Sequence, residues 1–412
     1  MPQDEQQLLL ALDLGTTTLA GRLLNLQGEV CAEATLFNPQ GRHGADVVRR
    51  MEAAMSGCGA ELQQDLHQGI DALVTRLLHQ CQAQREQISA AAAAGNPAIS
   101  CLLQGLAVDK LLYPPHRPAS LAAAWVALEC LPVPLFLFPL VSGYVGGDLV
   151  AVLYQYADCA AGTFFVDVGT NGEMALFNGE QWWVTSVAAG PAFEGGNISC
   201  GMVAQTGAVT GVALDGERLK LQVRGGGQPQ GLCGSGLVEA ISAGIAGGLI
   251  AADGTIADMD DVDNNLTRYL GHDAQGRTLC LYRDAKTLLQ LSQDDIRQFQ
   301  LAKGAIYAGA ECLVARAGMS VDALNTVIVT GALGFSMGRR AMKDVALLPE
   351  NMIKKVIFSD GGVIAGLSSY LIRGNAESLQ RLTTALHPYP LSGTPHFEQA
   401  FVAALNFPSR SL

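Results

Sequence analysis

Two short segments of the chain share the pattern Asp-x-Gly-Thr, which is suited to binding phosphate groups. Their residues are Asp13, Gly15, Thr16, Thr17 and Thr18 in the first segment and Asp167, Gly169, Thr170 and Asn171 in the second. A turn at glycine lets backbone N–H groups surround an anion, and threonine hydroxyls donate to phosphate oxygens. A carboxylate beside a polyphosphate is repelled unless a cation lies between them. We therefore expect these turns to bind nucleotide phosphates, with Mg²⁺ held partly through water by Asp13 and Asp167.

Both segments lie in the same sequence context, which indicates an internal duplication. The apolar run 7–14 predicts a buried strand, and two further strands are expected after the DLGTTT turn, up to residue 37. The order strand, Gly–Thr turn, strand, turn, strand starts again over 163–190, 154 residues later (167 − 13). This repetition predicts two similar α/β lobes with a nucleotide-binding cleft between them.

A third glycine turn follows the apolar run VIVTGALG, residues 327–334. A turn without bulky side chains leaves room for an adenosine or its α-phosphate, and the residues expected there are Gly331, Ala332 and Gly334. Two phosphate turns followed by an adenosine turn resemble the ASKHA superfamily of acetate and sugar kinases, Hsp70 and actin. The resemblance implies a two-lobed α/β fold of the actin or ribonuclease H type, with a duplicated β-meander lobe.

The remaining elements are expected from apolar periodicity and turn residues. In 60–85 the apolar residues recur every three or four positions, which predicts a helix with one buried face: Leu62, Leu66, Ile70, Leu73, Leu77 and Cys81. Further helices are expected over 44–56, 97–105, 145–157, from 231–236 to about 247, over 294–317 and at the end of 358–371; strands are expected over 88–94 and 133–141. The polar segment 256–285 is expected to be a surface insertion.

We expect an N-terminal lobe over 1–160, a C-terminal lobe over 161–373 and a tail over 374–412 that packs on the lobes.

The composition argues against several classes of protein. A net charge of −12 and a pI of about 5.0 disfavour nucleic acid and anionic membranes as partners. The most apolar region, 121–153, is interrupted by charged residues and prolines and makes a poor membrane span. The ten cysteines include no CxxC pair, which is typical of reduced cytoplasmic thiols, and the N-terminus lacks the pattern of a signal peptide. The seven histidines show neither HxxxH nor HExxH spacing, so the sequence does not favour a zinc site.

At a closer level the sequence resembles the ATPase region of the reductive activators of corrinoid proteins. The matching motifs follow in the order of that family: LDLGTTTLAGRL, NPQGRHGADVVRR, AGNPAISCLLQGL, PLVSGYVGGDLVAVL, VDVGTNGEMAL, AAGPAFEGGNISCGM, GLCGSGLVEAI, VIVTGALG and HFEQAFVAALNFP. They extend over about residues 8–408. The resemblance implies a protein that couples ATP hydrolysis to the reduction of an inactive Co(II) corrinoid methyl carrier to its Co(I) form.

The chain departs from that family in one respect. Family members carry an N-terminal [2Fe–2S] domain, whereas this chain has six residues before its first expected strand and no cysteine run that could hold a cluster. We therefore expect ATP and Mg²⁺ as cofactors and no iron–sulfur cluster. The expected partners are a corrinoid protein and a separate electron donor, in the cytoplasm, and the resemblance is compatible with a homodimer.

Further candidates come from the same motifs. Asp148 falls where related kinases and ATPases place a carboxylate that orients water or metal; alternatively it stabilises the positive end of a helix. Glu194 is either a carboxylate of the nucleotide site or an anchor of its loop, and Gly190 of the same loop is expected among the nucleotide-binding residues. Asn96 caps a helix or faces the nucleotide. The candidate catalytic residues are thus Asp13, Asp148, Asp167 and Glu194.

Three other functions fit the same turns. The first is a small-molecule kinase of the acetate and sugar kinase superfamily, with a defined substrate pocket. The second is a nucleotide-sensing binding module without hydrolysis. The third is an electron carrier like the dehydratase activators, in which one cluster bridges two subunits.

Overall fold

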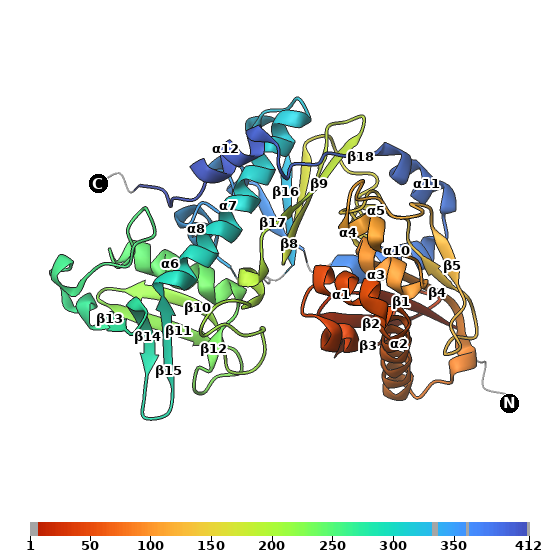
Figure 1. Ribbon diagram of the computed structural model, residues 1–412, viewed down its shortest axis with the longest axis horizontal. Coiled ribbons are helices and arrows are strands. Elements are labelled where there is room, and N and C mark those ends of the chain that lie inside the picture. Colours follow the sequence, from red (N-terminus) through yellow and green to blue (C-terminus); the bar gives the residue numbers. More distant parts are fainter. Residues whose placement is uncertain (1–6, 332–336, 360–361, 410–412) are drawn as a thin grey trace. The chain divides into compact units, whose positions relative to one another are not determined.

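The chain folds into two compact units. The structure is a computed structural model that describes residues 7–331, 337–359 and 362–409 (Figure 1). Unit 1 comprises Met1–Cys159 and Gly361–Pro388, and unit 2 comprises Ala160–Asp360 and Tyr389–Leu412. The chain therefore leaves unit 1, builds most of unit 2 and then returns to unit 1.

Unit 1 is built on a six-stranded sheet with the order β3-β2-β1-β4-β6-β5. The strands of this sheet are β1 (Leu8–Leu14), β2 (Thr18–Asn25), β3 (Val30–Phe37), β4 (Ile88–Gly95), β5 (Ala124–Val126) and β6 (Leu135–Leu137). The short strand β18 (Leu386–Pro388) also falls within the residues of unit 1 but is not part of this sheet. Its helices are α1 (Val47–Ala53), α2 (Gly59–Cys81), α3 (Pro97–Leu103), α4 (Asp109–Leu112), α5 (Gly147–Tyr154), α10 (Gly362–Arg373) and α11 (Ala376–Ala385), with the short turns of helix η1 (Pro39–His43), η2 (Ala54–Cys58) and η3 (Arg85–Gln87).

Unit 2 contains one large sheet and two small ones. The strands that unit 2 contributes to the large sheet run in the order β17-β16-β7-β8-β9, and the small sheets run β11-β10-β12 and β13-β14-β15. The strands are β7 (Thr163–Val168), β8 (Asn171–Phe177), β9 (Trp182–Ala188), β10 (Ala208–Asp215), β11 (Arg218–Val223), β12 (Gly231–Leu232), β13 (Leu270–Asp273), β14 (Gly276–Arg283), β15 (Leu288–Ser292), β16 (Thr326–Gly331) and β17 (Val356–Phe358). The helices are α6 (Gly234–Ala246), α7 (Gln293–Arg316), α8 (Arg339–Asp344), α9 (Glu350–Ile353) and α12 (Pro395–Ala403), with η4 (Pro191–Glu194), η5 (Met259–Asp261), η6 (Asn265–Tyr269) and η7 (Val321–Ala323).

The two units share one topology, which confirms the predicted duplication. In unit 1 the strands β1, β2 and β3 form an antiparallel meander, β4 pairs in parallel with β1, and β6 pairs in parallel with β4. In unit 2 the strands β7, β8 and β9 form the same meander, β16 pairs in parallel with β7, and β17 with β16. The register pairs Asp13 with Ala20 and Asp167 with Glu173, so each aspartate lies near the end of a central strand, just before the first hairpin turn.

The core of unit 1 forms where α2 covers the sheet. The predicted apolar stripe of this helix is confirmed, since its five leucine and isoleucine members are fully buried and Cys81 is half-buried. Leu8, Leu10, Leu12 and Leu14 of β1 belong to the same cluster. Because side chains alternate along a strand, Asp13 points to the opposite face of the sheet, and α10 packs against β1 and β4.

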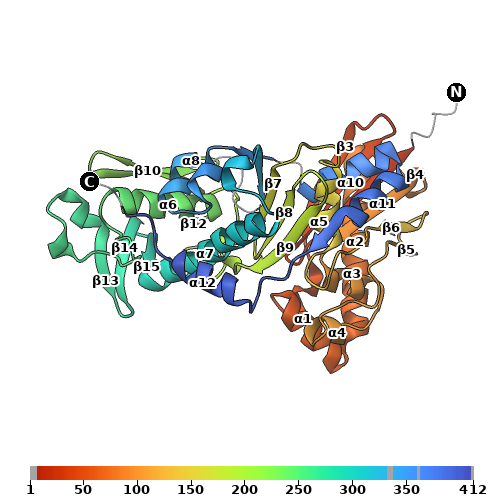
Figure 2. The same cartoon turned by 90° about the horizontal axis from the view of Figure 1, so that it is seen from above.

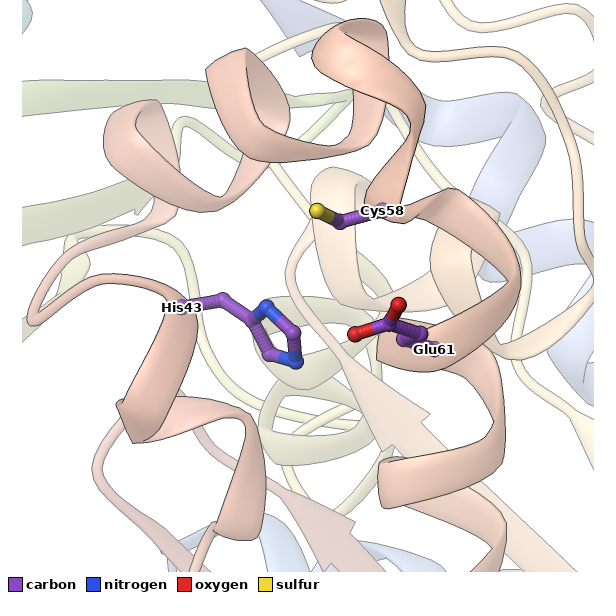
Figure 3. A group of neighbouring side chains, drawn as sticks. All are labelled: His43, Cys58 and Glu61. Carbon is purple, nitrogen blue, oxygen red and sulfur yellow. The ribbon is translucent and has the colours of Figure 1, made fainter.

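The start of α2 is set by a break in the helical backbone. Gly57, inside the π-helical turn η2, has φ +106°, which glycine adopts without strain, and the next residue, Cys58, ends η2 and is the N-cap residue of α2. Because the chain turns here, Cys58 and Glu61 face His43 at the end of η1 (Figure 3).

In unit 2 the long helix α7 packs along β8 and β9 (Figure 2). The segment 256–285 was expected to be a surface insertion, and this is wrong in both halves, since Ile256 and Leu266 of its first half are buried in the core. Strands β13 and β14 lie there, and Leu279 and Leu281 of β14 are buried in the core, since every second residue of a strand faces one side. The helix expected at the end of 358–371 is α10; we expected it to be the final helix of the chain, which is wrong because α11 and α12 follow.

No helix within the described ranges combines the length and the apolar character that are needed to cross a bilayer.

Lys303 on α7 is a fully buried cation that makes the stability of unit 2 dependent on pH. Its Nζ donates to the carbonyl oxygen of Asn406 at 2.6 Å and lies 5.3 Å from the centre of the Phe407 ring. Burial lowers the pKa of Lys303 from 10.5 to about 8. The folded chain therefore binds fewer protons than the unfolded chain between these two pH values, so the free energy of unfolding rises with pH through that window.

We expect the rise to be on the order of 3 kcal/mol for the wild type and absent in Lys303→Met, whose side chain keeps the packing volume. Scanning calorimetry at pH 7, 8, 9 and 10 measures it. If the two proteins show the same change in melting temperature with pH, the buried lysine is not its source.

Candidate functional site

The first Gly–Thr turn, between β1 and β2, is held in shape by a buried asparagine. A Cβ on Gly15 would lie 2.7 Å from the carbonyl oxygen of Thr18, so the turn requires glycine. The Nδ2 of Asn38 donates to the carbonyl oxygen of Gly15 at 2.9 Å. The backbone N–H of Asn38 donates to the carbonyl oxygen of Thr17, also at 2.9 Å. Asn38 was not among the predicted site residues. It belongs to the NPQ motif of the sequence, but only the structure reveals that it reaches back 23 residues.

Asn96 joins the same turn from the neighbouring strand. Strand β4 runs parallel to β1 and ends at Gly95, opposite Leu14; a Cβ on Gly95 would lie 2.7 Å from the carbonyl oxygen of Leu14. The Oδ1 of Asn96 accepts from the backbone N–H of Ile99 at 3.0 Å and so caps α3. Its Nδ2 donates to the Oγ1 of Thr16 at 3.1 Å. Of the two alternatives for Asn96, the helix cap is confirmed, and the same side chain also holds the Thr16 hydroxyl of the first Gly–Thr turn.

Asp148 lies in the first turn of α5, beside the residues that follow β4. A Cβ on Gly146 would lie 2.5 Å from the Oδ1 of Asp148 and 2.6 Å from the Cα of Asn96, so only glycine leaves room between them. The Oδ1 of Asp148 also accepts from the backbone N–H of Leu149 at 2.9 Å. Burial raises the pKa of Asp148 to about 6, although part of the side chain stays accessible to solvent. A carboxyl group with this pKa can gain or lose a proton near neutral pH.

The second Gly–Thr turn, between β7 and β8, is bound by Glu194. The Oε1 of Glu194 accepts from the backbone N–H of Thr170 at 3.0 Å, and its Oε2 accepts from the Thr170 hydroxyl at 2.8 Å. Gly190, with φ +80°, donates its N–H to the carbonyl oxygen of Thr170 at 2.9 Å. Thr170 is therefore fixed by three hydrogen bonds from the GPAFEG loop, and Glu194 anchors the turn in this conformation.

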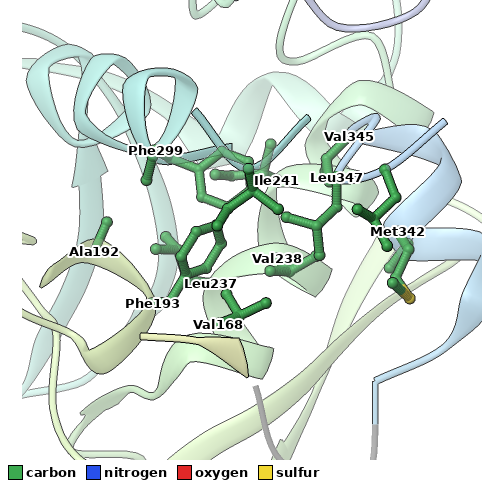
Figure 4. Close-up of a cluster of buried hydrophobic side chains, with 14 of the residues drawn as sticks. Val168, Ala192, Phe193, Leu237, Val238, Ile241, Phe299, Met342, Val345 and Leu347 are labelled. Atoms are coloured by element: carbon green, nitrogen blue, oxygen red, sulfur yellow. The ribbon is translucent and has the colours of Figure 1, made fainter. Parts of the chain in front are cut away.

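The position of Glu194 follows from the packing of the two residues before it. Ala192 and Phe193 of η4 are buried, and the Phe193 ring meets the Phe299 ring edge-on at 5.7 Å between centroids (Figure 4). Val168, at the end of β7, belongs to the same cluster. The core of unit 2 thus fixes both the strand that carries Asp167 and the loop that carries Glu194.

The third predicted turn begins where β16 ends. Gly331 pairs with Val168 in the parallel register and has φ +96°, and a Cβ on it would lie 2.2 Å from the Oδ1 of Asp167. Glycine is therefore required by both the backbone angle and the neighbouring carboxylate. The other two residues expected there, Ala332 and Gly334, lie outside the described residues.

Each unit thus carries the same arrangement. An aspartate near the end of the central strand lies beside a Gly–Thr turn, and a glycine ends the adjacent parallel strand: Asp13 with Gly95, and Asp167 with Gly331. The glycines keep side chains away from the strand ends, and the carboxylates are ligands of the kind that Mg²⁺ prefers. Such a surface can bind a phosphate chain and its metal ion.

A duplicated unit with these turns defines a protein of the ASKHA class. Residues 161–412 match the family model described as the C-terminal ASKHA domain of RACo, and residues 8–157 match the RACo middle region. The chain therefore belongs to the RACo family.

Known relatives point the same way. The chain is 27% identical to the corrinoid activation enzyme RamQ of Eubacterium limosum, over 95% of this chain and 69% of that protein. It is 23% identical to a [Co(II) methylated amine-specific corrinoid protein] reductase of Methanosarcina barkeri, over 79% of this chain and 63% of the relative. Among solved structures, a reductive activator for a corrinoid, iron–sulfur protein has a TM-score of 0.87 and 26% identity, covering 98% of this chain and 67% of that one. The chain thus spans about two thirds of the length of these relatives.

Proposed function

We propose that this chain is an ATP-dependent activator that enables the cobalt of a corrinoid protein to be reduced from Co(II) to Co(I). The observation that carries the proposal is the match to the RACo family over almost the whole chain, together with the Asp-x-Gly-Thr turn kept in both units. The relatives named for acting on corrinoid proteins support the substrate class.

The proposed roles of the residues follow from their contacts. Both turns take part in binding ATP, and Asp13 and Asp167 hold its Mg²⁺. Asp148 receives a proton from the attacking water. Positioning falls to Asn96 and Glu194, which hold the hydroxyls of their threonines. The proposed nucleotide-binding residues are Gly15, Thr16, Thr17, Thr18, Asn96, Gly169, Thr170, Asn171, Gly190, Gly331, Ala332 and Gly334.

The reduction consumes one electron per cobalt, which we propose comes from a separate low-potential donor. The two family models that match are those of the C-terminal ASKHA domain and the middle region of RACo, which supports an ATPase part that works with a separate donor. The proposed compartment is the cytoplasm, which the reduced, buried thiols of Cys101, Cys233 and Cys312 support. A homodimer is proposed from the resemblance to the reductive activators.

Binding of ATP is expected to stabilise the wild-type chain and not the Asp13→Ala variant. A ligand at about 100 times its Kd adds roughly 2.7 kcal/mol, a shift of a few degrees for a chain of this size. Thermal melts with and without ATP·Mg²⁺ measure the shift. The matched control is Asp109→Ala, an exposed aspartate of unit 1 in the first turn of α4, which should respond like the wild type. A shift that survives in Asp13→Ala contradicts the proposed metal ligand.

The activity itself is tested with a corrinoid protein held in the Co(II) state and Ti(III) citrate as the one-electron donor. Loss of the Co(II) absorbance should require both ATP and this chain, and a non-hydrolysable ATP analogue should not support repeated turnover. ATP-independent reduction, or ATP hydrolysis that leaves the cobalt unchanged with every corrinoid protein tried, contradicts the proposal.

A further inference from the structure

Unit 1 contains a histidine, a cysteine and a glutamate that are not part of the Gly–Thr turn and whose side chains converge. His43 ends η1, Cys58 precedes α2 and Glu61 lies in the first turn of α2. One potential ligand atom from each lies within 4.8 Å of the other two. Figure 3 shows the three side chains directed toward a common point. Nitrogen, thiolate and carboxylate together form a donor set typical of zinc.

The histidine is oriented by its neighbours so that one ring nitrogen is left for a ligand. The Nε2 of His43 lies 3.0 Å from the Oδ2 of Asp65, and this carboxylate is held by two further bonds from Arg42, at 2.6 and 2.8 Å. The Nε of Arg42 also lies 3.1 Å from Nε2, but its shorter contact is to Asp65. Two lone pairs facing each other at 3.0 Å would repel, so Nε2 carries the hydrogen and donates it to Asp65. The lone pair then lies on Nδ1, on the Cys58 side of the ring (Figure 3).

A carboxylate that accepts from the remote nitrogen of a histidine is the arrangement that orients metal-bound imidazoles in proteins. Asp65 is itself buried, and the side chain of His43 is only 10% exposed, so the ring has little freedom to turn away. Asp65 is therefore a positioning residue for His43.

The spacing and charge of the group suit a divalent ion. Tetrahedral ligands of zinc lie about 3.5 Å from one another, given its bond lengths of roughly 2.0–2.3 Å. Atoms within 4.8 Å of one another therefore need to move by only about 1 Å, within reach of side-chain torsions at the exposed Glu61. The thiolate of Cys58 and the carboxylate of Glu61 balance a charge of +2, and the N-terminal end of the 23-residue helix α2 favours both anions.

We propose that His43, Cys58 and Glu61 bind a divalent metal ion of the zinc type, with the fourth position open to solvent beside Glu61. The ion ties the end of η1 to the start of α2. Asn38, the N-cap residue of η1, holds the first Gly–Thr turn, so the ion stiffens the segment that supports this turn. The site stands apart from the proposed ATP function, and its test needs no nucleotide.

The test is titration of the full chain, stripped of metal and kept reduced without chelating thiols, with CoCl₂ and then ZnCl₂. We expect one Co²⁺ per chain, a near-ultraviolet thiolate-to-Co(II) charge-transfer band, and displacement of the Co²⁺ by Zn²⁺. Cys58→Ser should lose the band and bind Zn²⁺ on the order of 100-fold more weakly. Glu61→Gln should keep the band and also bind more weakly.

The matched control is Cys81→Ser, a half-buried thiol at the other end of α2, which should titrate like the wild type. Circular dichroism and melting of the metal-free proteins check that each variant is folded, and added Zn²⁺ should raise the melting temperature of the wild type but not of Cys58→Ser. The proposal is overturned if the wild type gives no thiolate band, or if Cys58→Ser keeps the band and the affinity.

Discussion

The Asp148→Asn variant is expected to hydrolyse ATP about 100 to 1,000 times more slowly than the wild-type chain, with little change in its affinity for ATP. Burial raises the pKa of Asp148 to about 6, and a base with a pKa near the working pH transfers protons most effectively. Because the proposed base acts in its ionised form, wild-type turnover should rise as the pH passes through about 6 and then level off. Phosphate release at saturating ATP·Mg²⁺, measured from pH 5 to 8, tests both points.

The same substitution is expected to stabilise the fold at neutral pH. The pKa of Asp148 is raised above its ordinary value of 3.8, so the folded chain binds more protons than the unfolded chain between pH 3.8 and about 6. The free energy of unfolding therefore decreases as the pH rises through this window. Above the window, the wild type is destabilised by the full free-energy cost of ionising Asp148 in the folded chain. That cost is at most roughly 3 kcal/mol, reduced by the solvent access of the side chain. Asparagine avoids the cost because it is neutral.

If Asp148→Asn loses turnover and also melts at a higher temperature at pH 7, Asp148 acts as the base and is not a carboxylate that only stabilises the fold. The control is Asp109→Asn, whose exposed side chain in the same unit should change neither quantity. A variant at position 148 that keeps more than a tenth of the turnover, or that still slows below pH 6 like the wild type, shows that another group takes the proton.

The Gly366→Ala variant is expected to lower the melting temperature of unit 1 by about 10 °C. Gly366 lies on α10 where this helix crosses α5, and a Cβ would lie 1.7 Å from the carbonyl oxygen and 2.4 Å from the carbonyl carbon of Ala151. Both atoms belong to the backbone, so no rotamer change relieves the clash and α10 must move away from α5. The loss of packing outweighs the roughly 1 kcal/mol by which alanine favours a helix over glycine. Scanning calorimetry measures the change.

Gly59→Ala is the matched control for this prediction. Gly59 is the first residue of α2, and a Cβ there would lie 3.7 Å from its nearest neighbour, the carbonyl oxygen of Ala54. This variant should melt at the same temperature as the wild type or slightly higher. If Gly366→Ala also melts within about 2 °C of the wild type, the two helices are less closely packed than the structure indicates.

The parts of the fold that the sequence predicts are those encoded by neighbouring residues. The two meanders follow from short apolar runs that end at Asp-x-Gly-Thr, and α2 follows from an apolar residue at every third or fourth position. The aspartates and Gly–Thr turns were found in this way, and the structure places them at matching positions in the two sheets.

The parts that sequence reasoning misses depend on contacts between distant residues. The sequence around Asn38 does not indicate that its side-chain amide donates to the carbonyl oxygen of Gly15. Every residue has a backbone carbonyl oxygen, so this acceptor leaves no signal in the sequence. The role of Glu194 stayed open until its two bonds to Thr170 were seen. The group of His43, Cys58 and Glu61 has no recognisable spacing, since its members converge only where Gly57 turns the backbone.

The return of residues 362–388 to unit 1 sets the order in which the protein is made. A ribosome must add 201 residues after Cys159 (360 − 159) before it reaches the second segment of unit 1, which takes roughly 10–40 s at 5–20 residues per second. During that time the face of β1 and β4 that α10 covers in the finished fold has no helix from that segment. The nascent chain therefore carries an unfinished apolar surface while unit 2 emerges, and this interval is when a chaperone would bind it. For the same reason a gene fragment that ends at residue 159 encodes an incomplete unit, whereas one that joins 1–159 to 361–388 supplies all its helices.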